Sequence, residues 1–371
     1  MRKHELLGLA MFVTGTFSAC NSGSSPRAPA ADGGKSGTYA LDASASVKPD
    51  ASHLNAPTDA PYDDWTWLAF PDSKCASGKP GGIAINPHAG SKTLVLYFEG
   101  GGECYDASTC WGDKPTDLNL NGYNSEIFSD AAQRKYPIFD RGLLENPLRE
   151  SNMVFIPYCT GDLHSGTTER DLQVDGNPKP TYFWGAKNLE LYLADLVARF
   201  AGTKQVWMIG TSAGGYGTVL NFDRVVNAFH APTNVIDDSG PPIMAKGATT
   251  NPLLKVWGYV APEGCDTCTS YPNILHHDRA LQPQSRYGFL SFAQDTVISS
   301  RLGYKLTEYP AVMDAFSNSL KDDANAATYI VTNEAAHVVE SDLTLAPKYM
   351  LWLDVMASGD ASWKDTTYAK P

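Results

Sequence analysis

The sequence predicts an α/β protein with a doubly wound, mostly parallel sheet and helices on both faces of that sheet. Short apolar runs of strand length alternate with stretches that place apolar residues at helical spacing. Such alternation is typical of parallel strands that are joined by crossover helices. The expected strands occupy residues 93–98, 152–158, 205–209, 234–237, 289–293 and 328–332, and the expected helices occupy residues 188–200, 219–229 and 343–356.

The composition indicates a globular domain. The chain has 371 residues, of which 43% are hydrophobic, and this suffices for one large hydrophobic core. The formal net charge at pH 7 is −12, so the sequence carries no basic footprint for nucleic acid. Beyond the N-terminal segment, no apolar run is long enough to span a bilayer.

The N-terminus has the features of an export signal. Arg2 and Lys3 precede a largely apolar stretch at residues 6–17, which is too short for a transmembrane helix. Small residues before Cys20 resemble a bacterial lipobox, so Cys20 either carries a lipid that anchors the protein to a membrane or follows an ordinary cleavage site. We expect residues 1–19 to be removed and the protein to be exported, as a cell-envelope lipoprotein or an extracellular protein.

The remaining chain divides by composition. Residues 21–60 are rich in Ser, Ala, Gly, Pro and Asp, which predicts a flexible tether. Large aromatic residues appear from Tyr62 onward, so residues 62–371 are expected to form the folded domain. Residues 241–286 are longer than a simple crossover needs, and we expect a cap-like insert there.

The cysteines are consistent with export. There are seven, and if Cys20 carries lipid an even number remains in an oxidising compartment. Close spacing favours two local disulfide bonds and leaves one pair over, so the candidates are Cys104–Cys110, Cys265–Cys268 and Cys75–Cys159.

A zinc site is the alternative for Cys265 and Cys268. A structural zinc ion would need two further ligands, and no second closely spaced Cys or His pair accompanies them, although His276 and His277 are near in sequence. We therefore expect a disulfide bond and no metal.

Gly210-x-Ser212-x-Gly214 carries the strongest chemical signal. It follows an apolar strand directly and precedes an amphipathic stretch, which is the context of the sharp strand-to-helix turn that exposes a nucleophilic serine in α/β-hydrolases. A plain Gly-Ser turn and a phosphate-binding loop are the alternatives, but no Lys follows the second glycine. The sequence therefore predicts an α/β-hydrolase-type fold with Ser212 as the nucleophile.

A serine nucleophile needs a histidine base, which in this fold comes last in chain order. His337 lies just past the final expected strand, where a parallel sheet delivers residues to its carboxyl edge. The other histidines after Ser212 lie at the end of a helix or in the expected insert, and they are His230, His276 and His277. We therefore expect His337 to be the base.

The acid that orients the histidine is expected one strand earlier. Asp295 follows the strand at residues 289–293, so it is the favoured candidate. Asp237 and Asp238 follow the strand after the serine and are the alternative, although Asp-Ser-Gly-Pro-Pro also fits a simple turn with an Asx cap.

Backbone N–H groups should stabilise the oxyanion that develops during acyl transfer. One is expected from Ala213, the residue after the nucleophile. The others are expected from the glycine loop at residues 99–103, with Gly101 and Gly102 as the candidate donors. A flexible glycine turn is the plain alternative.

These motifs resemble those of the pectin acetylesterase and Notum family. The resemblance extends from about Trp65 to the C-terminus and is carried, in the family's order and spacing, by Cys75-Ala-Ser-Gly-Lys-Pro, Glu99-Gly-Gly-Gly-Glu-Cys104 with Tyr105, Ile156-Pro-Tyr-Cys159 with Gly161-Asp162, Gly210-Thr-Ser-Ala-Gly-Gly215 and Asp238-Ser-Gly240.

The resemblance implies a triad of Ser212, Asp295 and His337 that hydrolyses small acyl esters without a cofactor. In the family these esters are acetyl groups on plant pectin or a fatty acyl group on a signalling protein. Glu103 stands where plant members usually carry Trp, and the segment around His337 lacks the cysteine that is common there. The resemblance therefore implies an esterase more specifically than it implies pectin.

The leading hypothesis is a secreted serine esterase that hydrolyses small acyl esters, acetyl groups on a polysaccharide among them. One alternative is a depolymerase of a polyester such as polyhydroxyalkanoate, which would need an open groove. Another is a non-catalytic surface lipoprotein that binds glycans, which would not need a complete triad. The sequence makes no prediction about the oligomeric state.

Overall fold

The structure is a computed structural model of the chain, and it describes residues 60–113 and 119–371. The expected signal peptide at residues 1–19, the lipidation candidate Cys20 and nearly all of the expected tether lie outside the described residues. Within the described ranges, no helix combines the length and the apolar character needed to cross a membrane.

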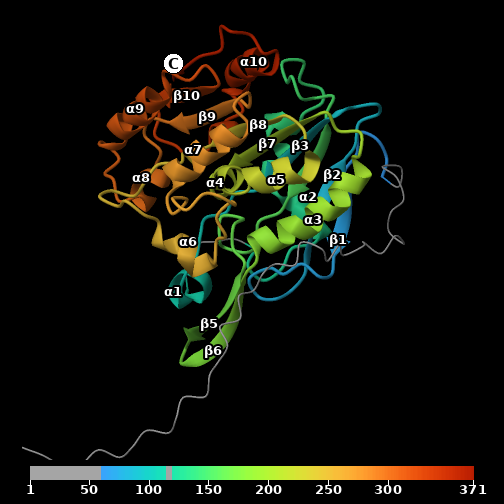
Figure 1. Cartoon of the computed structure of the whole chain (residues 1–371), viewed down its shortest axis with the longest axis vertical. Coiled ribbons are helices and arrows are strands. Elements are labelled where there is room, and N and C mark those ends of the chain that lie inside the picture. The colour runs from blue at the N-terminus through green and yellow to red at the C-terminus, as the bar shows by residue number, and fades with distance from the viewer. Residues whose placement is uncertain (1–59, 114–118) are drawn as a thin grey trace, which may run out of the picture. The chain divides into compact units, whose positions relative to one another are not determined.

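A nine-stranded sheet forms the centre of the described chain (Figure 1). Seven neighbouring strands run parallel to one another, and across the sheet they are β4, β3, β7, β8, β9, β10 and β11. Strand β2 is antiparallel to β4, and β1 is antiparallel to β2. This confirms the mostly parallel α/β sheet. In order across the sheet, the strands are β1 (Thr66–Phe70), β2 (Gly81–Asn86), β4 (Asn152–Ile156), β3 (Thr93–Phe98), β7 (Gln205–Thr211), β8 (Thr233–Asp238), β9 (Tyr287–Phe292), β10 (Ala326–Thr332) and β11 (Thr366–Ala369).

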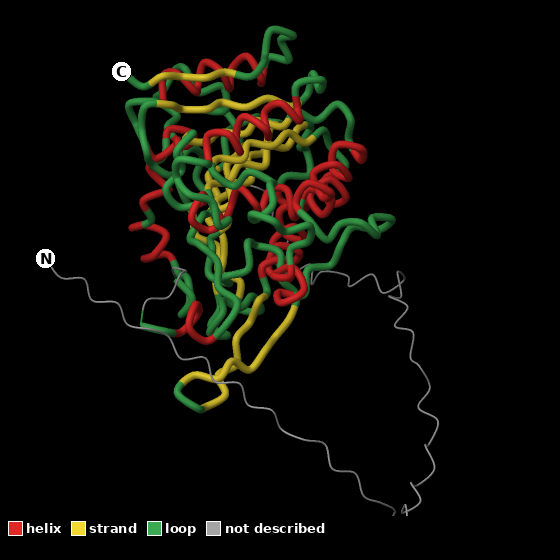
Figure 2. Tube along the Cα trace, turned by 90° about the vertical axis from the view of Figure 1, so that its left-hand side faces the viewer, coloured by secondary structure: helices red, strands yellow, loops and turns green. Residues whose placement is uncertain are grey.

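Strand β3 illustrates why both faces of the sheet must be covered. Leu94, Leu96 and Phe98 belong to one hydrophobic core, and the intervening Val95 and Tyr97 belong to the other. Alternate side chains of a strand point to opposite faces, so a strand that is apolar throughout needs a helical layer on each side. Figure 2 shows the strands between helices on either side.

Helix α3 is typical of these layers. Leu189, Leu193 and Leu196 are buried at helical spacing, as the sequence pattern predicts. The helices of the described residues are α1 (Ala107–Trp111), α2 (Ser125–Asp130), α3 (Gly185–Arg199), α4 (Ala213–Leu220), α5 (Phe222–Phe229), α6 (Pro252–Trp257), α7 (Tyr271–Leu281), α8 (Ile298–Arg301), α9 (Tyr309–Leu320) and α10 (Ala346–Ala357), with short 3-10 turns η3 (Ala132–Lys135), η4 (Pro137–Phe139) and η5 (Val339–Ser341).

The segment at residues 241–286 contributes less to a cap than we expected. Helix α7 lies in the chain between the parallel neighbours β8 and β9, and its Ile274 and Leu275 are buried in the main core, so it is a crossover helix. The earlier part of the segment carries α6, where Trp257 Nε1 donates a hydrogen bond of 2.8 Å to the carbonyl oxygen of Cys104. Helix α6 therefore lies beside the end of the glycine loop.

A hairpin of β5 (Thr168–Val174) and β6 (Asn177–Phe183) forms a separate two-stranded sheet. The sequence did not predict it, because its strands are rich in charged and polar residues. Figure 1 shows the hairpin extending past α1, away from the central sheet. The Thr167 N–H donates to the carbonyl oxygen of Trp257 over 2.9 Å and so joins the base of the hairpin to α6.

Three disulfide bonds join the described cysteines, and they are Cys75–Cys159, Cys104–Cys110 and Cys265–Cys268. The candidate ligand atoms of Cys265, Cys268 and His277 lie within 4.8 Å of one another. Because the two sulfur atoms are bonded to each other, neither is a thiolate that could bind a metal ion.

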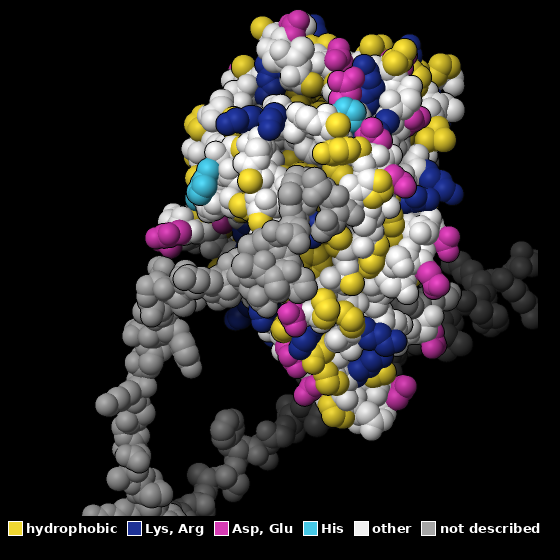
Figure 3. Space-filling model, turned by 90° about the vertical axis from the view of Figure 1, so that its right-hand side faces the viewer, with side chains coloured by type: hydrophobic (Ala, Val, Ile, Leu, Met, Phe, Trp, Pro, Cys, Tyr) yellow, Lys and Arg dark blue, Asp and Glu magenta, His cyan; other side chains and the backbone are white. Residues whose placement is uncertain are grey.

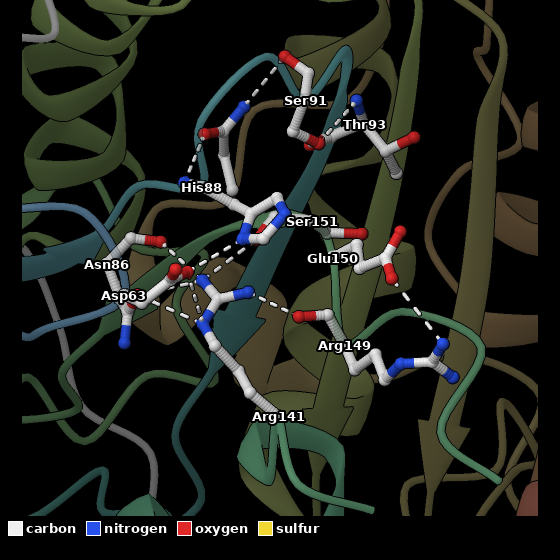
Figure 4. Close-up of polar contacts among 10 residues, drawn as sticks. Asp63, Asn86, His88, Ser91, Thr93, Arg141, Arg149, Glu150 and Ser151 are labelled. Carbon is white, nitrogen blue, oxygen red and sulfur yellow. Dashed lines mark hydrogen bonds and ion pairs between the residues drawn. The ribbon is translucent and has the colours of Figure 1, made fainter. Parts of the chain in front are cut away.

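A cationic cluster lies near the amino end of β4 (Figure 4). The Arg141 guanidinium donates to the Asn86 side chain over 2.7 Å, and to the carbonyl oxygens of Asn86 and Ser151 over 3.0 Å each. Asp63 accepts an ion pair of 3.2 Å from Arg141 and contacts His88 Nδ1 at 2.7 Å. Burial lowers the pKa of Arg141, and the charge of Asp63 opposes this shift. We call these residues the Arg141 cluster.

Candidate active site

The residues predicted to carry chemistry lie at the ends of parallel strands. Gly100 follows β3, Ser212 follows β7, Asp295 follows β9 and His337 follows β10. Because these strands are parallel, all four residues are delivered to the carboxyl edge of the sheet, where α/β proteins place their ligand sites.

Ser212 occupies a sharp turn between β7 and α4. Its backbone has φ 55° and ψ −117°, which a non-glycine residue adopts only at a cost of about 1–3 kcal/mol. Gly214 must be glycine, because a Cβ atom there would lie 1.9 Å from the carbonyl oxygen of Phe98. This close approach lets the serine stand at the tip of a turn that is wedged against β3.

His337 and Asp295 are joined directly. His337 Nδ1 lies 3.0 Å from Asp295 Oδ1 and 2.9 Å from Asp295 Oδ2. Asp295 is fully buried, and its Oδ1 also accepts the N–H groups of Val297 and Ile298 at 2.9 and 2.8 Å. The carboxylate therefore has a fixed orientation and leaves Nε2 of the imidazole available for proton transfer.

The other part of the site is Ser212, which is only partly buried. Among the described residues, no hydrogen bond joins its hydroxyl to His337, a contact that often tightens only when substrate binds. The Ser212 backbone is bonded to the neighbouring strand β8, because the Ser212 N–H donates to the carbonyl oxygen of Asp238 over 2.7 Å.

Neither rival acid contacts the imidazole ring. Asp237 Oδ1 accepts the N–H of Gly240 over 2.8 Å, which is the Asx-type turn that its sequence context suggests. Asp238 instead accepts the N–H groups of Val339 and Glu340, which follow His337 in the chain. In this geometry Asp295 is the only one of the three aspartates that is bonded to the ring.

The glycine loop is held close to the serine turn. The Gly100 N–H donates to Gln133 Oε1 over 2.9 Å, and Gln133 Nε2 donates back to the Gly100 carbonyl oxygen over 3.0 Å. A Cβ atom on Gly100 would lie 2.4 Å from the carbonyl oxygen of Thr211 and 3.2 Å from Cβ of Ser212. The loop and the nucleophile candidate are therefore packed side by side.

The candidate oxyanion donors follow from this arrangement. Within the described residues, the N–H groups of Gly101 and Gly102 make no backbone hydrogen bond. Ala213 is the first residue of α4, so its N–H has no partner within that helix. Gly102 is fixed at its other side, because Tyr158 Oη donates to its carbonyl oxygen over 3.0 Å.

Glu99 anchors the start of the loop from beneath. Its carboxyl accepts the Tyr158 N–H at 2.9 Å and the Tyr123 hydroxyl at 3.0 Å. Burial raises the pKa of Glu99 to about 8, although these two hydrogen bonds oppose the rise. His164 Nε2 lies 2.8 Å from the Glu99 carbonyl oxygen, and burial lowers the pKa of His164 to about 4, so the ring is neutral and donates there.

Sequence reasoning did not identify two of these supports. His164 lies just after the Cys159 to Asp162 segment that carried part of the family resemblance, so its position was a usable signal. Gln133 lies in a short 3-10 turn with no distinctive pattern, and only the folded structure places its amide against Gly100.

The face shown in Figure 3 has no large patch of positive charge among its described residues. There, Lys and Arg side chains lie among Asp and Glu side chains.

Known proteins that are similar to the chain show which protein family it belongs to. The family model of the pectinacetylesterases matches residues 68–259, which is more than half of the chain. The chain belongs to this family, as the sequence motifs suggested, and its sheet is that of an α/β-hydrolase.

Particular relatives are the Notum proteins. The chain is similar to palmitoleoyl-protein carboxylesterase Notum of Schmidtea mediterranea, at 30% identity over 171 residues, which cover 44% of this chain and 31% of that protein. The human Notum protein is 32% identical over 161 residues, covering 41% of this chain and 29% of that protein. The chain thus spans about a third of the length of the curated relatives it matches.

A solved structure supports the fold. The Wnt deacylase Notum from Drosophila aligns with a TM-score of 0.58 and 19% sequence identity, covering 84% of this chain and 97% of the other. At this identity the likeness establishes the shared fold and not the shared substrate.

Proposed function

We propose that the protein is an exported serine esterase that hydrolyses small acyl esters, with acetyl groups on a polysaccharide as the leading substrate. The observation that carries the proposal is the pair of contacts between His337 Nδ1 and the Asp295 carboxylate, at the sheet edge where Ser212 stands in a strained turn. Membership of the pectinacetylesterase family supports the same reaction type.

In the proposed reaction, the Ser212 hydroxyl attacks the ester carbonyl while His337 Nε2 accepts its proton. The tetrahedral intermediate collapses, His337 returns the proton to the leaving alcohol, and an acyl-serine remains. Water then attacks the acyl-serine by the same route and releases the carboxylic acid. Asp295 holds the imidazole in the required tautomer and stabilises the imidazolium that forms.

The oxyanion of each tetrahedral intermediate would accept hydrogen bonds from Ala213 and from Gly101 or Gly102. The reciprocal bonds between Gly100 and Gln133 support this assignment, because they hold the loop rigid. Within the described residues, the N–H groups of Gly101 and Gly102 make no backbone hydrogen bond that would compete with the oxyanion. Donors that are oriented in advance need no reorganisation as charge develops.

Export is supported by the three disulfide bonds, which persist in oxidising compartments. The proposed signal peptide at residues 1–19, the tether at residues 21–60 and a lipid on Cys20 complete this picture of a domain at residues 62–371 that acts outside the cytoplasm. Mass analysis of the mature N-terminus tests it, since a diacylglyceryl group on Cys20 would indicate a lipoprotein.

Hydrolysis of p-nitrophenyl esters of increasing chain length tests the proposed reaction, with acetylated pectin and acetylated xylan assayed beside them. The proposal expects the highest kcat/KM on acetyl or other short esters, and release of acetate from at least one polysaccharide. A preference for long acyl chains would instead bring the substrate closer to that of the Notum relatives, and failure to hydrolyse any ester would contradict the proposal.

A further inference from the structure

Asp238 touches both halves of the candidate active site through the backbone. It is the last residue of β8, and its carbonyl oxygen accepts the Ser212 N–H over 2.7 Å. Its side chain reaches the loop that carries the histidine, because Oδ1 accepts the Val339 N–H over 3.0 Å and Oδ2 accepts the Glu340 N–H over 2.7 Å. One residue therefore lies between the nucleophile candidate and the histidine loop.

Ser239 extends this contact by one residue. Its Oγ accepts the Val338 N–H over 3.1 Å and donates to Asp238 Oδ1 over 2.9 Å. Its own N–H donates to the Leu290 carbonyl oxygen over 2.8 Å, which ties the pair to β9. Three consecutive N–H groups directly after His337 are thus held by two adjacent side chains.

The histidine loop has a conformation that needs such support. Val338 has φ 66°, a region that β-branched residues strongly disfavour. The Val338 side chain is buried, and the hydrogen bonds from the N–H groups of Val338, Val339 and Glu340 hold the backbone in this conformation. Asp238 and Ser239 are themselves fully buried, which strengthens these bonds.

We propose that Asp238, with Ser239, is a positioning residue that sets the place of the His337 imidazole relative to the Ser212 hydroxyl. It acts through the backbone of both, while Asp295 alone orients the ring. The inference rests on the proposed function, and it gives the Asp238-Ser-Gly240 motif a role other than that of a simple turn.

The charge around Asp238 is compatible with this role. Burial raises the pKa of Asp238 to about 6, while the two N–H groups, Ser239 and His337 oppose the rise, so the group is a carboxylate at neutral pH. Burial, and then the charge of Asp238, raises the pKa of Glu340 well above its usual range. The titratable groups that interact with Asp238 are His337, Glu340, Asp237, Tyr97, Tyr136 and Tyr349.

The test compares Asp238→Asn and Ser239→Ala with the control Asp365→Asn. Asp365 also accepts a backbone N–H of β10, that of Thr328 at 2.8 Å, but it is exposed and not in the candidate site. Hydrolysis of p-nitrophenyl acetate is measured across pH, together with hydrogen exchange of the Val338 to Glu340 amides in the full chain.

For Asp238→Asn we expect kcat to fall about 10- to 100-fold with little change in KM, because a misplaced base costs rate more than binding. The acid limb of the kcat profile should move to lower pH, since a negative charge near His337 has been removed. The three amides should exchange faster. Ser239→Ala removes the acceptor of the Val338 N–H and a donor to Asp238, but it leaves the acceptors of the other two amides in place. It should therefore show a smaller loss, and it keeps the test informative if Asp238→Asn folds poorly.

An unchanged kcat, pH limb and exchange rate in both variants would overturn the proposal. So would a loss in Asp238→Asn as large as that in Asp295→Asn, because Asp238 would then be the triad acid. If the wild-type protein hydrolyses no ester, the proposed function fails, while the exchange measurement still decides whether Asp238 holds the histidine loop.

Discussion

Charged side chains lie at both ends of the strands of the central sheet. At the amino ends a cation donates hydrogen bonds to carbonyl oxygens, whereas at the carboxyl ends a carboxylate accepts them from N–H groups. At the amino end of β4, Arg141 donates to the carbonyl oxygens of Asn86 and Ser151 and to the Asn86 side chain (Figure 4). At the carboxyl edge, Asp238 accepts N–H groups after His337, and its carbonyl oxygen accepts that of Ser212. Both arrangements form hydrogen bonds to buried backbone groups, but only Asp238 contacts the backbone next to candidate catalytic residues. Burial and hydrogen bonding alone therefore do not mark a functional site.

Loss of the candidate nucleophile should lower activity more than any other substitution. Ser212→Ala should lower kcat for ester hydrolysis by at least about 10,000-fold, because no acyl-enzyme can form. Ser291→Ala, a control at a buried serine of β9, should keep nearly full activity. Near-normal hydrolysis by folded Ser212→Ala protein would exclude the carboxyl edge as the proposed site.

The next effect separates the acids at the carboxyl edge. Asp295→Asn should lower kcat about 1,000- to 10,000-fold, because the amide favours the wrong imidazole tautomer. The loss should exceed that of Asp238→Asn at least tenfold, and that of Asp237→Asn by more. Steady-state kinetics on one acetyl ester rank the three variants, and any other order would reassign the acid.

A substitution in the Arg141 cluster should lower the free energy of unfolding without changing the rate of ester hydrolysis. Arg141→Met removes the donors to four oxygens, which are the carbonyl oxygens of Asn86, Arg149 and Ser151 and the side-chain oxygen of Asn86, so the free energy of unfolding should fall by about 2–3 kcal/mol. Urea unfolding measures this loss, and kcat per folded molecule should stay within about twofold of wild type. A large fall in kcat with unchanged stability would contradict the conclusion that the Arg141 cluster has a structural role and not a catalytic one.

The smallest effect concerns pH and Glu99. Its pKa rises from 4.5 to about 8 on folding, so the folded state holds an extra proton between these values. Stability from this group is complete below pH 4.5 and is lost as the pH rises through 8. Glu99→Gln stays neutral, so its Tm relative to wild type should rise by a few degrees between pH 5 and pH 9. A constant difference in Tm would show that Glu99 is ionised in the folded protein.

The sequence predicted those parts of the fold and site that depend on local pattern. Strand β3 was placed at its observed bounds, because Thr93 and the five apolar residues after it lie between Lys92 and Glu99 and leave little choice. Ser212, Asp295 and His337 were predicted from chain order and strand ends, since the proposed reaction restricts both residue type and position. The geometry brings Asp295 and His337 into contact and places Ser212 at the same edge.

What the sequence could not provide depends on partners far away in the chain. The amides of Gln133 and Gly100 meet across 33 positions, and Asp238 meets Glu340 across 102. The polar hairpin of β5 and β6 has no hydrophobic pattern to reveal it. The helix expected at residues 219–229 is interrupted at Asn221, between the end of α4 and the start of α5. The Asn221 amide donates to the carbonyl oxygens of His164 and Gly217.

Stoichiometric labelling tests the claim that Ser212 forms the acyl-enzyme. The protein would be treated with a fluorophosphonate, its residual esterase activity followed, and the labelled peptide identified by mass spectrometry. We predict one adduct per chain, located on Ser212, with activity lost in proportion to labelling and no adduct in Ser212→Ala. Full esterase activity after complete labelling, or an adduct on another residue that tracks the loss of activity, would contradict the claim.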